Sequence, residues 1–159
     1  MDGGAYREHF AAYPVIYLSM RTAKGDTWEQ TYGALKDMLA AGFSRHSYLF
    51  ESSALPDRDE AAAIALVSGT PSESDYAGSL LCFARLLRAH HGRPVVLLID
   101  EHDAPVMAGY SASDGGCCRE IVTFLKRLLT GPFKDGGEVL TFACLTGLSA
   151  SPRSPSSPT

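Results

Sequence analysis

Apolar residues form three short continuous runs, and between the runs they recur every three or four positions. The runs are Tyr13–Met20, Pro94–Ile99 and Glu138–Leu145. Short runs rich in apolar and β-branched residues predict buried strands, and Pro14 suits the first position of a strand. The second run, PVVLLI, is apolar at every position, which is typical of a strand covered on both faces.

The intervening segments predict helices. Asp26 is a candidate N-cap, with Glu29 placed to reach back to it, and Gly42 is a plausible end of that helix. Ser72 followed by Asp75 predicts the start of another helix. Two further helices are expected over residues 57–67 and 118–129. Residues 43–56 and 108–116 are interpreted as loops. The Ser/Pro-rich tail, residues 150–159, is expected to be disordered.

Strands that alternate with helices predict an α/β fold, because parallel strands need long right-handed crossover connections. We therefore expect a parallel sheet flanked by helices, in a three-layer arrangement. Residues 1–149 are expected to form one partial domain of this kind.

Composition and charge limit the classes of partner and the location that we expect for this chain. The 159 residues carry a net charge of -4, with no Lys/Arg run, so nothing favours binding to nucleic acid or to an anionic membrane. No apolar run approaches the ~20 residues of a membrane span, and no signal-peptide pattern opens the chain. The four cysteines lack metal-site spacing and suit free thiols. These features predict a cytoplasmic protein.

Asp100 and Glu101 directly follow the second predicted strand. Ligands of open α/β sheets bind at the carboxyl ends of strands, so this acidic pair is the first candidate site. One carboxylate together with substrate phosphates can hold Mg²⁺, and a neighbouring carboxylate can orient or deprotonate an attacking water. The alternative is a solvated acidic turn after a core strand. His102 could act as a general acid or base, or could be an ordinary loop side chain.

A second candidate is the sequence LTGLS after the third predicted strand, where Thr146 or Ser149 could hydrogen-bond a phosphate or a water. The alternative is that Thr146 and Gly147 simply terminate the strand. The phosphate-binding motif G-x-x-x-x-G-K-[ST] occurs nowhere in the sequence. The pattern therefore offers acidic and hydroxyl groups for a nucleotide site without a loop that cradles phosphates.

These segments together resemble the AAA-ATPase-like family over about residues 6–149. The most specific parts are RPVVLLIDEHDAPV and EVLTFACLTGLS, in the family's order and spacing. The resemblance implies a P-loop NTPase fold that binds ATP and Mg²⁺, with Asp100 linked to the metal, Glu101 activating water, and Thr146 near a sensor position. It also implies that Asp103 and Pro105 shape the turn after the strand.

Three departures from the family stand out. The phosphate-binding loop is missing, His102 replaces a residue that is usually Tyr, and the sequence after Ser149 turns into SASPRSPSSPT. We therefore expect a fragment of an ATPase-like protein, itself inactive in hydrolysis for lack of the loop. The different-class alternative is a catalytically inert protein-interaction module. The family's missing strand would pair beside Glu138–Leu145, so an exposed sheet edge is expected there, with self-association through it.

Overall fold

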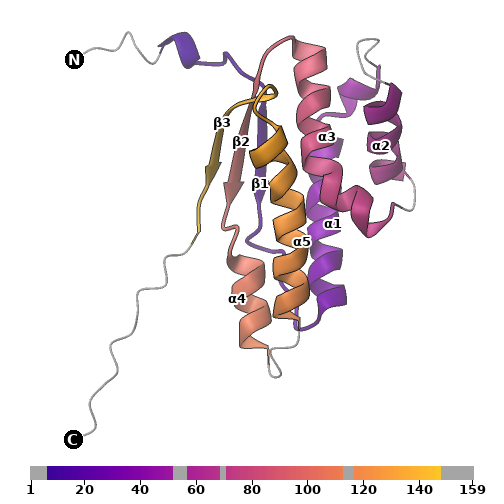
Figure 1. Ribbon diagram of the computed structural model, residues 1–159, viewed down its shortest axis with the longest axis vertical. Coiled ribbons are helices and arrows are strands. Elements are labelled where there is room, and N and C mark those ends of the chain that lie inside the picture. Colours follow the sequence, from indigo (N-terminus) through magenta and orange to yellow (C-terminus); the bar gives the residue numbers. More distant parts are fainter. Residues whose placement is uncertain (1–6, 52–56, 69–70, 113–116, 148–159) are drawn as a thin grey trace, which may run out of the picture.

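The computed structural model describes residues 7–51, 57–68, 71–112 and 117–147. Its centre is a sheet of three strands in the order β1-β2-β3, and both pairings are parallel, as predicted (Figure 1). The strands are β1 (Val15–Ser19), β2 (Val95–Asp100) and β3 (Leu140–Leu145). β1 and β3 are shorter than the apolar runs that predicted them, and β2 is as long as its run but shifted by one residue, so that it includes Asp100.

The helices fill the connections between these strands. The first connection holds α1 (Trp28–Ser44), the short η2 (Ser47–Glu51), α2 (Asp57–Ser68) and α3 (Glu73–His91). The second holds α4 (Ala104–Ser111), α5 (Cys118–Thr130) and η3 (Gly131–Asp135), while the short η1 (Arg7–His9) precedes β1. The predicted Ser/Pro-rich tail lies outside the described residues, as do 52–56 and 113–116 of the predicted loops.

The helix starts agree with the sequence at α3 and differ at α1. Ser72 and Asp75 form the predicted capping box of α3. At α1 the cap is Thr27, whose extended backbone lets its hydroxyl accept from the N–H of Gln30. Gln30 in turn accepts from the N–H of Asp26 at 2.9 Å. The sequence DTWEQ contains two overlapping capping patterns, and the structure uses the one that starts a residue later.

The predicted loop 108–116 is wrong over its first part, because α4 occupies Ala104–Ser111. Pro105 lies in the first turn, where its missing N–H costs nothing. Small residues dominate this helix, so the sequence contains no apolar stripe that would reveal it. Gly109 has a packing reason, since a Cβ there would lie 2.6 Å from Cδ1 of Ile121 on α5.

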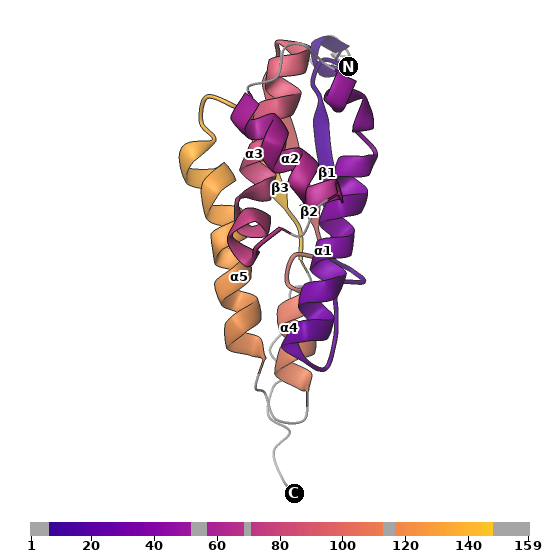
Figure 2. The same cartoon turned by 90° about the vertical axis from the view of Figure 1, so that its right-hand side faces the viewer.

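One face of the sheet forms the core. Alternate strand residues point into it, and helices α1, α3 and α5 lie over that face in both views (Figures 1 and 2). Phe124 of α5 is almost fully buried and packs its ring 5.3 Å from that of Tyr32 on α1. The strand residues that point into this core are Ile16, Leu18, Val95, Leu97 and Ile99.

The opposite face of the sheet has no helical layer among the described residues, so the expected three-layer arrangement is not what this part of the chain forms (Figure 1). Val15 is 42% exposed and Phe142 58% exposed on that face. The reason is topological. Each connection steps in the same direction across the sheet, and right-handed crossovers then place every helix on the same face.

Three further observations concern the sheet edge, the cysteines and the length of the helices. β3 is an edge strand of the described sheet, as the sequence predicted. All four cysteines are free thiols. Among the described residues, the helices are too short or too polar to span a bilayer.

Candidate functional site

The carboxyl ends of the three strands meet at one edge of the sheet. Ser19 of β1 pairs in register with Asp100 of β2. Thr146 follows the last residue of β3, and its hydroxyl donates a short hydrogen bond to Oδ1 of Asp100. Two of the three residues predicted to form the site are thus brought into direct contact from 46 positions apart.

The backbone of Thr146 forms hydrogen bonds both to β2 and to the turn that follows β2. Its N–H donates to the carbonyl of Ile99 at 2.9 Å, and its carbonyl accepts from the N–H of His102 at 3.0 Å. Gly147 then passes so close to the acidic turn that a Cβ would lie 2.8 Å from Oδ1 of Asp103. A side chain at this position would therefore force the Asp103 side chain to move where the strand end meets the turn.

Glu101 lies apart from this contact and has a different partner. Its backbone is left-handed, with a φ of 50°, which is uncommon for a residue with a side chain. Its carboxylate Oε1 accepts from Nε of Arg21 at 3.1 Å. The Arg21 side chain is 74% exposed, so the pair is solvated and adds little stability. Arg21 lies two residues beyond the end of β1, and no sequence signal linked two residues 80 positions apart.

Asp103 and Pro105 do shape the turn beyond β2. Asp103 is the cap residue of α4, and although its side chain makes no capping hydrogen bond, its carbonyl accepts from the N–H of Met107 at 2.9 Å. The chain thus turns from strand to helix within three residues. This tight turn places Glu101 just beyond the end of the sheet, directly after Asp100, the last residue of β2.

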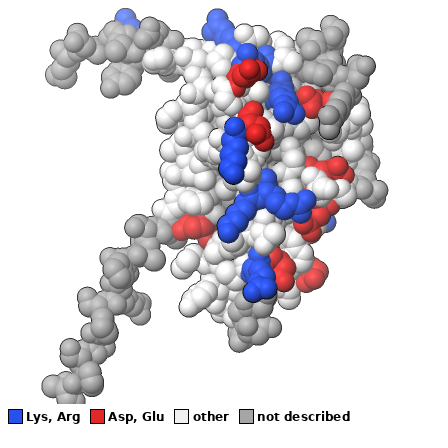
Figure 3. Space-filling model, in the orientation of Figure 1, with Lys and Arg blue, Asp and Glu red and all other residues white. Residues whose placement is uncertain are grey.

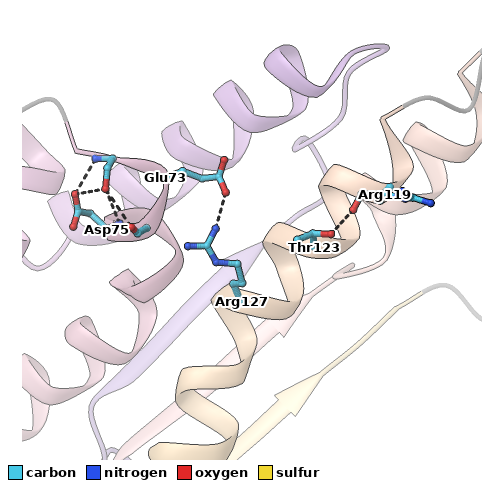
Figure 4. A network of polar contacts seen from close by, with 7 residues as sticks. Glu73, Asp75, Arg119, Thr123 and Arg127 are labelled. Carbon is cyan, nitrogen blue, oxygen red and sulfur yellow. Dashed lines mark hydrogen bonds and ion pairs between the residues drawn. The ribbon is translucent and has the colours of Figure 1, made fainter.

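A polar network that the sequence did not predict lies away from this edge. Figure 4 shows Glu73 of α3 and Arg127 of α5 pointing toward one another, with a distance of 2.7 Å between Oε1 and Nη1. Burial raises the pKa of the nearby Tyr32 phenol, and the charge of Glu73 adds to that rise. The ion pair joins the ends of two packed helices, so its role is structural.

Charges on the helical face are mixed. Figure 3 shows Lys and Arg side chains interspersed with Asp and Glu along the line of α5. The described part of this face therefore has no extended patch of one sign.

Several hollows lined by the described residues are large enough for a ligand, and two of them adjoin the sheet or the turn that follows β2. The larger, about 540 Å³, lies at the amino ends of the strands, between Tyr13, Val15 and Phe142. It is remote from the acidic pair and reflects the uncovered sheet face. The second, about 430 Å³, opens beside His102 and Asp103 and continues along the apolar side of α5 past Leu129. Of these two hollows, the second adjoins the candidate site.

The donor atoms at the strand ends suit a hard cation. Asp100 offers a carboxylate, and Ser19 and Thr146 offer hydroxyl oxygens, which are the ligand types that Mg²⁺ prefers. Among the described residues no three His, Cys, Asp or Glu side chains gather as a metal cluster. Mg²⁺ commonly binds through one carboxylate, waters and substrate phosphates, so a single Asp is compatible with it.

The described residues form an α/β protein with a parallel sheet, in which an acidic residue and a hydroxyl are joined at neighbouring strand ends. In open α/β sheets, ligands bind at that edge. A family model described as predicted AAA-ATPase matches residues 4–152. The chain therefore belongs to this AAA-ATPase-like family. No curated protein and no solved structure gives a significant match.

Proposed function

We propose that this chain provides the metal-binding and water-activating half of an ATP-hydrolysing site. Asp100 is the Mg²⁺-linked acid, Glu101 the water-activating residue, and Thr146 the residue that contacts the bound nucleotide. The observation that carries the proposal is the hydrogen bond from the Thr146 hydroxyl to Asp100, which joins the ends of two neighbouring strands. A solvated acidic turn does not require that contact.

The chemistry of each group follows from its type. Thr146 occupies Oδ1 of Asp100, and a carboxylate has a second oxygen that can bind a cation. Mg²⁺ bound there would neutralise charge on the phosphates. Glu101 is an acceptor when ionised, so it can hold the attacking water and take its proton. Arg21 contacts only Oε1 of Glu101, so Oε2 can hold that water while the ion pair persists.

The other half of the site must hold the phosphates. The sequence contains no G-x-x-x-x-G-K-[ST] loop, so we propose that another segment supplies it. A strand paired with the free edge of β3 would have to cross back over the sheet to reach β1. Right-handedness would place the helix of that crossover on the uncovered face, beside Val15 and Phe142. One strand–loop–helix unit would thus cover both the edge of β3 and the exposed face of the sheet.

The same uncovered face supports a second candidate function. An apolar sheet face is also what an interaction module presents to a partner, and in that case Asp100 and Glu101 have no ligand. Tyr17 is 48% exposed there and Phe142 58%. The two candidates differ in whether the acidic strand end binds a divalent cation.

Mn²⁺, which substitutes for Mg²⁺ at oxygen sites, provides the test. Free Mn²⁺ is measured by electron paramagnetic resonance in the presence of ATP and the purified chain, with ATP alone as the baseline. We expect additional binding by the wild type and its loss in Asp100→Asn. The matched control is Asp37→Asn, which removes an exposed carboxylate from α1. Equal binding by wild type and Asp100→Asn would reject the nucleotide-site proposal and favour the interaction module.

A further inference from the structure

His102 makes a contact that neither its position in the acidic turn nor the resemblance explains. Its Nδ1 lies 2.8 Å from the carbonyl oxygen of Thr146. The backbone N–H of His102 donates to the same oxygen at 3.0 Å. One residue of the turn thus holds the end of β3 through both its main chain and its side chain.

The partner atom fixes the protonation of the ring. A carbonyl oxygen only accepts, so Nδ1 must carry the hydrogen. In the neutral imidazole this leaves Nε2 without one. The contact therefore requires a hydrogen on Nδ1, which the neutral ring carries only in its Nδ1–H tautomer, and spectroscopy can observe this choice directly.

The bond from His102 acts on Asp100 through Thr146. Thr is β-branched and restricted at χ1, so the orientation of its backbone limits the directions in which its hydroxyl can point. His102 holds the carbonyl of Thr146 while the hydroxyl donates to Asp100. Gly147, the next residue, also packs closely against His102, because a Cβ there would lie 3.1 Å from Cε1 of the His102 ring.

We propose that His102 is a positioning residue, whose Nδ1–H orients Thr146 and thereby fixes the Asp100 carboxylate at the strand end. This inference rests on the proposed function only for its consequence in metal binding. The arrangement of the side chains themselves is a separate claim and is tested separately.

Two substitutions separate the hydrogen bond from the ring. His102→Phe keeps an aromatic ring of similar shape without a donor. His102→Asn keeps an N–H at the same number of bonds from the backbone. His90→Phe, on the remote end of α3, is the matched control for loss of an imidazole.

Three measurements follow. Long-range ¹⁵N–¹H spectra at pH 8, where imidazoles are ordinarily neutral, should show the Nδ1–H tautomer in wild type. Hydrogen exchange at the amides of His102 and Thr146 should quicken roughly two- to tenfold in His102→Phe, the factor expected for one lost hydrogen bond. The ¹³Cγ resonance of Asp100 should move in the same variant. His102→Asn should restore both properties, and His90→Phe should change neither.

The outcomes separate this inference from the proposed function. An Nε2–H tautomer, or a His102→Phe variant with unchanged exchange and an unchanged Asp100 resonance, would overturn the inference. Failure of His102→Asn to restore them would do the same, because the role would then be one of ring packing. If wild type binds Mn²⁺ and His102→Phe binds it equally well, the positioning role is rejected while the proposed function stands. If wild type binds no Mn²⁺, the proposed function fails, and the tautomer and Asp100 resonance still decide the role of His102.

Discussion

Replacing Phe142 with Lys should prevent the isolated chain from associating with itself. Phe142 lies on β3, an edge strand, and its side chain is 58% exposed on the uncovered face of the sheet. Val15 and Tyr17 are 42% and 48% exposed on the same face. An apolar edge next to an apolar face favours pairing with another chain, and charge on such an edge opposes it.

The size of the effect follows from the exposed area. A Phe side chain carries on the order of 200 Å². With 58% of it exposed, burial in a complex would remove about 115 Å² from water. At about 25 cal/mol per Å² this is about 3 kcal/mol for each copy. Loss of that amount weakens association by about a hundredfold for each Phe142 that is buried.

Sedimentation velocity or light scattering over a concentration series measures this association. Wild type should form dimers or larger species as concentration rises, and Phe142→Lys should remain monomeric to at least a hundredfold higher concentration. Tyr110→Lys is the matched control, because Tyr110 is 76% exposed on α4, away from the sheet. Val139→Lys is a poorer choice, since Val139 is only 8% exposed and the change would unfold the chain. A wild type that stays monomeric, or equal association by Phe142→Lys, would refute the reasoning.

Three other predictions concern the site and its support. The purified chain should release no phosphate from ATP above background, since it lacks the phosphate loop, and turnover that disappears in Glu101→Gln would contradict this. Gly147→Ala should weaken Mn²⁺ binding, because its Cβ would lie 2.8 Å from Oδ1 of Asp103. The control is Gly33→Ala in α1, where a Cβ meets open space. This control should leave Mn²⁺ binding unchanged and stabilise the helix by up to ~1 kcal/mol. Burial, and then two neighbouring imidazoles, lower the pKa of His91. At His91 the unfolded chain therefore binds a proton more readily than the folded chain. The contribution of His91 to the free energy of unfolding should be fully present above about pH 6.5 and be lost as the pH falls below it. If the urea midpoint of His91→Gln changes with pH as much as that of wild type, His91 is not the cause.

The sequence predicted the strands well because their signal is local. PVVLLI and the other apolar runs carry it within six to eight residues, and each observed strand lies within its run or one residue beyond it. The capping pair Ser72 and Asp75 is equally local and was also predicted. α4 was missed because its small residues leave no apolar period, so its only signal was Pro105 after Asp103.

The arrangement of layers depends on information that no segment contains. Strand order, together with right-handed crossovers, decides which face the helices cover, and the order β1-β2-β3 places them all on one face. The contacts of the site show the same limit. Asp100 and Thr146 were expected at one edge because both follow strands. The pairing of Glu101 with Arg21 depends on the positions of two separate strand ends.

The central claim is that the ends of β2 and β3 bind a divalent cation together with nucleotide phosphates. Paramagnetic broadening locates such a cation directly. With substoichiometric Mn²⁺ and ATP, amide resonances of Ser19, Asp100 and Thr146 should broaden first, and Asp100→Asn should abolish the effect at all three. Broadening centred elsewhere, or absent from these three residues while Mn²⁺ is bound, would contradict the account.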